Sequence, residues 1–128
     1  MAIAHLQEIL FSLLKQQNAL NNKLSANMMQ TVSASRNYSE KQVKYNQKIQ
    51  NYYYAYYDSD PNTYYEMVEA VENERELELG QLQSWEAQLN AEKDEIETQL
   101  SEINTYRDAY MKLLGHNCKK DFTYGSVS

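Results

Sequence analysis

Residues that commonly carry catalysis or hold a metal are scarce in this chain. It has two histidines, His5 and His116, and one cysteine, Cys118. His116 and Cys118 could supply two ligands to a metal, but a structural zinc site has four, and the sequence has no second cluster. It also lacks a glycine-rich phosphate loop, a Gly-x-Ser-x-Gly elbow and a His-Glu-x-x-His motif. We therefore expect no catalytic residue, no cofactor and no metal site, and a protein that is not an enzyme.

One stretch has part of the spacing of a calcium loop. Asp58, Asp60, Asn62 and Glu69 occupy positions that correspond to four calcium ligands of an EF-hand. A proline interrupts this stretch, however, and Thr63 stands where the loop requires glycine. A calcium-responsive turn is thus an alternative that calorimetric titration would test. We expect the remaining carboxylates to be solvated charges on helix faces rather than a pair for acid/base catalysis.

The composition predicts the elements that carry these residues. The chain has 128 residues, of which 42% are hydrophobic and 23% charged, as in a single folded domain. Only three glycines and one proline occur, which favours long helices. We predict an all-α fold, a long antiparallel helical hairpin or two-helix coiled coil, with a first arm over about 2–57, a turn at 58–62, a second arm over about 63–114 and a flexible tail at 115–128.

The first arm has apolar residues at heptad spacing and no helix breaker. Its stripe consists of Ile3, Leu6, Leu10, Leu13, Leu20, Leu24, Tyr38, Tyr45 and Tyr52. Residues 27–37 are its weakest part, because Asn27 stands where the stripe requires an apolar group and three Ser and Thr side chains follow. A kink in this segment is therefore an alternative to a continuous helix.

The second arm has clear boundary signals. Asp60 can cap a helix with Pro61 at its first position, while Thr63 and Glu66 also have capping-box spacing. Gly115 suits the position after the last helical residue. The apolar stripe of this arm consists of Val68, Leu82, Leu89, Ile96, Ile103 and Tyr110.

The two stripes and the charges agree on one register. If the chain folds back near residue 60, residues whose numbers add to about 120 lie level. This predicts a seam between the arms, formed by Leu10, Leu24, Tyr38, Leu82, Leu89, Ile96, Ile103 and Tyr110. Residues 1–57 have six Lys and Arg against two acids, or +4, and residues 58–114 have four against fifteen, or −11. Lys41, Lys44 and Lys48 would then face the acidic run 72–78.

Seven of the twelve tyrosines lie in residues 51–65, around the only proline. Three consecutive residues already cover about 200° of a helix, so one partner helix cannot cover all these rings. Either they lie along the surface with their hydroxyl groups in water, or they form a contact patch, since tyrosine is enriched in interfaces. We take the patch as the main interpretation, with interaction residues Tyr52, Tyr53, Tyr54, Tyr56, Tyr57, Tyr64, Tyr65 and Trp85.

The turn also carries a resemblance to a known family. Ser59, Asp60 and Pro61 lie between the two predicted helices in the stretch DSDPNTYYEM. In this feature the chain resembles the subunits of bacterial type III secretion needles, short helical hairpins whose turn typically reads Pro-Ser-Asp-Pro. Asp58 stands where that turn has its first proline. The resemblance implies a hairpin that forms filaments.

These observations favour a structural protein that assembles with itself, as a subunit of a filament, tube or similar polymer. The alternative is a cytoplasmic helical adaptor or a binding module like a secretion chaperone, acting as a discrete oligomer with another helical protein. The charge pattern argues against a nucleic-acid partner, and residues 1–14 lack the basic face of a membrane-surface helix. Because we find no signal peptide and no transmembrane run, we expect a protein that is cytoplasmic or exported by a signal-independent route.

Overall fold

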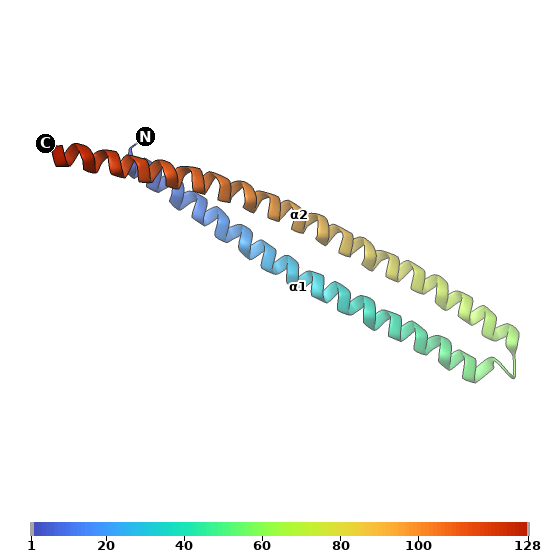
Figure 1. Ribbon diagram of the computed structural model, residues 1–128. Coiled ribbons are helices and arrows are strands. Elements are labelled where there is room, and N and C mark those ends of the chain that lie inside the picture. The colour runs from blue at the N-terminus through green and yellow to red at the C-terminus, as the bar shows by residue number, and fades with distance from the viewer. Residues whose placement is uncertain (1, 128) are drawn as a thin grey trace. The chain divides into compact units, whose positions relative to one another are not determined.

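The computed structural model describes the backbone of residues 2–127 and the side chains of residues 2–120. These residues form two α-helices, α1 (Ile3–Tyr56) and α2 (Pro61–Val127), which are joined by a short turn and pack antiparallel (Figure 1). The predicted all-α hairpin is therefore confirmed. Contacts divide the chain into two units. Unit 1 contains residues 1–27 and 92–128, and unit 2 contains residues 28–91, which include the turn.

Unit 1 is held together by aliphatic side chains from both helices. Leu13 and Leu20 of α1 pack with Ile96 and Ile103 of α2, and this buried cluster is flanked by Ile9, Leu24, Leu100 and Tyr110. Burial of one such aliphatic side chain contributes about 1.5–3 kcal/mol. The heptad spacing along α1 places these leucines on one side of the helix, so the stripe forms a continuous apolar contact.

Polar contacts fix the register of unit 1. Gln17 lies on the seam, where its Nε2 donates a hydrogen bond to Asn104 Oδ1 at 3.1 Å. Its Oε1 accepts one from Arg107 Nη1 at 3.0 Å. Gln17 is thus a polar residue in the seam whose side chain is satisfied by amide and guanidinium partners from α2.

Unit 2 has fewer large aliphatic side chains in its interior. Its buried side chains are Ala34, Tyr45, Val71 and Leu89. Gln83 Nε2 donates to the Tyr38 hydroxyl at 3.4 Å across the seam. Here the stripe contains alanine and tyrosine where unit 1 has leucine, so ring packing and polar contacts take over part of the role of aliphatic packing.

The cross-helix contacts confirm the predicted register. Each pair described above joins residues whose numbers add to about 120, as expected for a fold-back near residue 60. Lys41 and Lys48 pair with glutamates of the acidic run, as expected, whereas Lys44 makes no ion pair among the described residues. Among the predicted seam residues, Leu89, Ile96 and Ile103 are buried, and the half-buried ones are Leu10, Leu24, Tyr38, Leu82 and Tyr110.

The turn forms around Asp60. Its carboxylate accepts hydrogen bonds from the backbone N of Thr63 at 3.3 Å and from the Thr63 hydroxyl at 2.5 Å. This is the expected cap, with Pro61 as the first residue of α2. The helix therefore begins at Pro61 rather than at Thr63, and Thr63 serves as a partner of the cap instead of acting as a cap itself.

α1 is one continuous helix through residues 27–37, as in the main expectation, and the alternative of a break there is not seen, although Asn27 is buried in the stripe. One expectation about helix ends needs correction, because α2 continues past Gly115 to Val127, whereas we expected it to end before this residue. A glycine ends a helix when it adopts a positive φ, and Gly115 does not, so the cost of about 1 kcal/mol relative to alanine leaves the helix intact. We also expected residues 115–128 to be flexible, and the side chains of residues 121–128 lie outside the described part of the chain.

Candidate functional site

The turn of unit 2 gathers tyrosines from both helices. Tyr53 lies in the last turn of α1 and Tyr57 follows directly after the helix, and their rings stack with centroids 4.6 Å apart. Tyr64 from the first turn of α2 meets Tyr53 edge-on at 5.9 Å and Tyr57 at 5.4 Å. Such edge-to-face contacts are worth about 0.5–1.5 kcal/mol each beyond area burial. We call these three rings the turn cluster, and they connect the helix ends across the turn.

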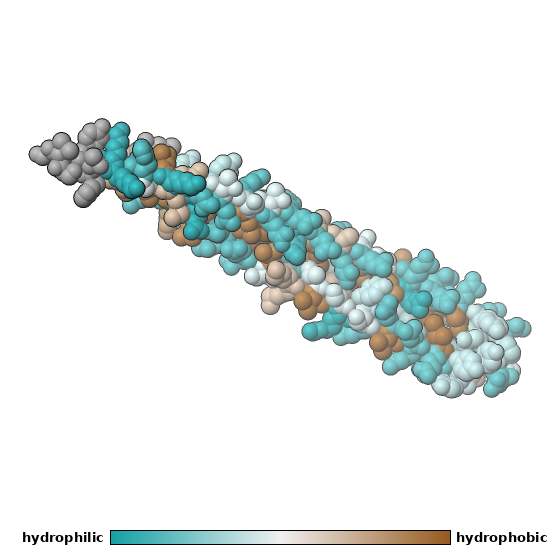
Figure 2. All heavy atoms as spheres, viewed as in Figure 1, coloured by the Kyte–Doolittle hydropathy of each residue, from teal (hydrophilic) through white to brown (hydrophobic). Residues whose placement is uncertain are grey.

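Two further tyrosines extend the turn cluster into solvent. Tyr54 is 76% exposed and touches Tyr53 edge-on, with centroids 5.8 Å apart. Tyr65 is 60% exposed and touches Tyr64 in the same way at 5.3 Å. In Figure 2 the turn end of unit 2 is covered by pale atoms of intermediate hydropathy, as expected for tyrosine rings. These two rings are the part of the site that a neighbouring molecule could cover.

The remaining predicted interaction residues are less accessible. Tyr52 and Tyr56 are half-buried and form a tilted pair whose ring centroids are 6.5 Å apart. Trp85 lies away from the turn on α2 and is also half-buried, so it is only partly available to a partner. The seven tyrosines are thus brought together, whereas Trp85 is separate from them.

The carboxylates of the turn act as caps rather than as ligands. The two hydrogen bonds from Thr63 hold the pKa of Asp60 below its usual value of 3.8, since they favour the charged form. Among the described residues, no group of three or more His, Cys, Asp and Glu side chains is placed to hold a metal ion. The calcium alternative therefore gains no support from the geometry.

A buried polar network in unit 2 was not expected from the sequence. The hydroxyl of Tyr45, which is fully buried, donates to Glu78 Oε2, and Lys41 Nζ lies 2.8 Å from Glu78 Oε1. This carboxylate raises the pKa of Lys41, by its hydrogen bond and then by its charge. Lys44 and Lys48 each place their Nζ 5.5 Å from the Tyr45 ring centroid. The signal was present, because the predicted register sets Glu78 almost level with Tyr45.

The outer face of α1 in unit 2 is apolar. Met29 is 74% exposed, and Met28, Val32 and Val43 are at least half exposed. Val32 and Val43 are eleven residues apart, close to three helical turns, so they lie on the same side, opposite the seam. Arg36 lies between them on that side and is exposed.

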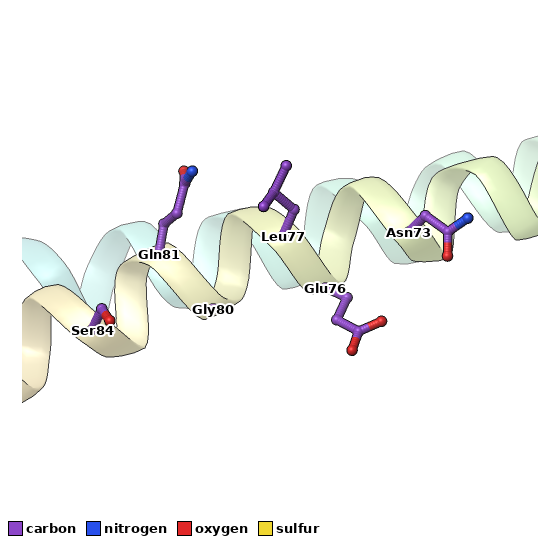
Figure 3. Close-up of a pocket in the computed structure, with 6 residues that line it drawn as sticks. All are labelled: Asn73, Glu76, Leu77, Gly80, Gln81 and Ser84. Carbon is purple, nitrogen blue, oxygen red and sulfur yellow. The ribbon is translucent and has the colours of Figure 1, made fainter.

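The outer face of α2 in unit 2 is shallow and acidic. A surface depression there is lined by Asn73, Glu76, Leu77, Gly80, Gln81 and Ser84 (Figure 3). Figure 3 shows Leu77 and Gln81 projecting to one side and Glu76 to the other, with bare backbone at Gly80 between them. A Cβ atom at Gly80 would meet nothing within 4 Å, so the glycine leaves open space rather than serving contacts within the chain.

Unit 1 has an apolar groove along its seam. It is lined by Gln7, Leu10, Phe11, Leu14, Arg107, Met111 and Leu114. Lys15 places its Nζ 4.7 Å from the Phe11 ring centroid at the edge of this groove. The groove has the apolar character that a helix of a partner could use.

None of the helices in the described part of the chain has an apolar stretch of the length needed to cross a bilayer. Comparison of the chain with protein-family models, with curated proteins and with solved structures finds no match.

Proposed function

We propose that the chain is a non-enzymatic structural protein that assembles with itself into a filament, tube or similar polymer. The observation that carries this proposal is the tyrosine surface at the turn, where Tyr54 and Tyr65 project into solvent from a cluster of packed rings. Rings held by their neighbours lose little conformational entropy when a partner covers them, which favours association. The resemblance of the Ser59-Asp60-Pro61 turn to needle subunits points to the same class of function.

A two-helix unit also leaves apolar side chains uncovered on its outer faces. Exposed Met28, Met29, Val32 and Val43 lie on α1 of unit 2, opposite the seam, where the chain itself provides no cover. Contiguous exposed apolar surface on a folded protein marks sites of association. Contacts between copies would cover it, and repeated contacts of this kind build a polymer.

The proposal is tested by the size and form of the purified protein. Size-exclusion chromatography with light scattering, over a range of concentrations, is expected to show species many times the 15.0 kDa mass of one chain. Negative-stain microscopy is expected to show ordered particles. A single species of 15.0 kDa at every concentration refutes self-assembly.

The apolar groove of unit 1 favours a second candidate, an adaptor or chaperone-like module that binds another helical protein. Leu10, Phe11 and Met111 line a surface onto which an amphipathic helix could place its apolar face. This alternative predicts a discrete dimer or mixed complex that stops growing. Light scattering separates the two, since only the polymer gains mass as concentration rises.

A further inference from the structure

We infer that one copy docks the outer face of its α1 onto the outer face of α2 in the next copy, with both faces in unit 2. This inference rests on the proposed self-assembly and names the surfaces that perform it. The docking side of α1, here the α1 face, consists of Met28, Met29, Val32, Arg36 and Val43. The receiving side, the α2 face, consists of Glu69, Glu76, Leu77, Gly80 and Ser84.

Charge supports this pairing through the α2 face. Residues 58–91 have one Arg against nine acids, or −8, and residues 28–57 have four Lys and Arg against one acid, Glu40, or +3. Within the hairpin only Lys41 and Lys48 pair with the acidic run, through Glu78 and Glu74. On the outer faces, Arg36 and the glutamates at 69 and 76 are exposed and make no ion pair among the described residues. Their charges are therefore available to a second copy.

Pairing of two α2 faces is disfavoured by the same charges, because it would bring the glutamates of both copies together. The α1 face is close to neutral, since exposed Glu40 lies on the same side of the helix as Arg36, eleven residues after Met29. A contact between unlike faces sets Arg36 against Glu69 and Glu76. The unlike pairing is thus the one that gives the negative charge of the α2 face a cation.

Shape agrees with charge. The α1 face presents large side chains, with Met29 74% exposed, and the α2 face is lowest at Gly80, where no side chain fills the surface. Leu77, which is 67% exposed, lies at the edge of this depression and offers an apolar contact (Figure 3). Small residues at a helix contact permit close approach, so a valine from a second copy fits over Gly80.

The two faces lie on opposite sides of unit 2, because each lies opposite the seam on its own helix. A contact between unlike faces leaves one free face at each end of a pair. Such a head-to-tail contact adds copies until a ring closes, or continues as a filament.

Two variants separate the faces. Val43→Glu places a carboxylate in the α1 face, and Leu77→Glu places one in the α2 face. Each is expected to raise the concentration needed for assembly about tenfold or more, because the contact would bury an unpaired charge beside glutamates or lose its apolar anchor. Gln42→Glu is the matched control, since it adds the same charge at an exposed position of unit 2 away from both faces and is expected to assemble like the wild type. Circular dichroism checks that all variants keep their helices.

Mixing the two variants gives the decisive result. The Val43→Glu chain keeps a working α2 face and the Leu77→Glu chain keeps a working α1 face, so an equimolar mixture is expected to form a one-to-one pair that cannot grow. Light scattering would show twice the 15.0 kDa mass and no polymer. If the wild type assembles and either variant assembles as readily, or the mixture shows no pair, the assignment of faces is wrong while self-assembly stands. A wild type that stays monomeric removes the proposed function itself.

Discussion

Removing the hydroxyl group of Tyr45 tests whether the buried network stabilises unit 2. Tyr45→Phe keeps the ring in its fully buried position and deletes only the donor to Glu78. A hydrogen bond to a charged group contributes about 1.5–3 kcal/mol. Because the Glu78 side chain is 31% exposed, water can replace part of this bond, and we expect a loss of about 1–2 kcal/mol.

Two further substitutions of the same network set the scale. Tyr45→Ala also removes the ring and is expected to cost about 3–5 kcal/mol, as large aromatic deletions from a core do. Lys41→Gln is expected to cost less than Tyr45→Phe, because the Lys41 and Glu78 side chains are both only partly buried and solvent screens the pair. The expected order of stability loss is therefore Tyr45→Ala, then Tyr45→Phe, then Lys41→Gln.

Urea unfolding followed by fluorescence of Trp85 measures this order. Trp85 is the only tryptophan and lies in unit 2, so its signal reports on the unit that contains Tyr45. With a slope of about 1–3 kcal/mol per molar urea, Tyr45→Phe should lower the midpoint by about 1 M. Tyr106→Phe is the control, since Tyr106 is exposed in unit 1, and should leave the midpoint unchanged. A Tyr45→Phe midpoint equal to that of the wild type, or a larger loss with Lys41→Gln, would refute the reasoning.

Three further outcomes are expected. Gly115→Ala should stabilise α2 by up to about 1 kcal/mol and raise its helicity on circular dichroism, because the helix passes through this position with free space around it. A fall in helicity would instead indicate that α2 ends at Gly115. The pKa of the charged cap Asp60 is lowered, so its contribution to the stability of the fold is present above pH 3.8 and is lost as pH falls through the folded-state pKa. The thermal midpoint of Asp60→Asn should lack this pH dependence. The double variant Tyr54→Ser, Tyr65→Ser should reduce the assembly seen by light scattering and change the thermal midpoint only as little as a typical surface substitution does. Tyr64→Ala should lower the thermal midpoint more, because it removes a ring from the turn cluster.

Most of the fold follows from periodicity and charge. The heptad stripes define the sides of both helices that meet, and the capping residues Asp60 and Pro61 define where α2 begins. The agreement of the two stripes with the Lys-to-Glu complementarity was enough to give the register. These signals are strong because each depends on spacing along one helix, and tertiary contacts strengthen rather than oppose them.

The parts that were missed depend on side-chain geometry. That α2 continues through Gly115 could not be read from the residue type, since glycine ends a helix only in one backbone conformation. The partnership of Tyr45 with Glu78 required knowing that a hydroxyl at a seam position reaches a carboxylate on the other helix. Trp85 is 20 residues beyond Tyr65 on the same helix, so its separation from the turn tyrosines follows from the sequence, whereas its half-burial depends on packing that spacing alone did not assign.

The turn cluster has a consequence for how the chain folds. Tyr53 and Tyr64 meet across only eleven residues of sequence, whereas Tyr45 and Glu78 are 33 apart and Gln17 and Arg107 are 90 apart. The entropy lost on closing a loop rises with the logarithm of its length, so contacts at the turn form at the lowest cost. We expect the two helices then to pair progressively from the turn toward the chain ends, because each contact that forms shortens the loop that the next contact must close. We therefore expect the rings of the turn cluster to influence the folding rate, in addition to the association proposed above.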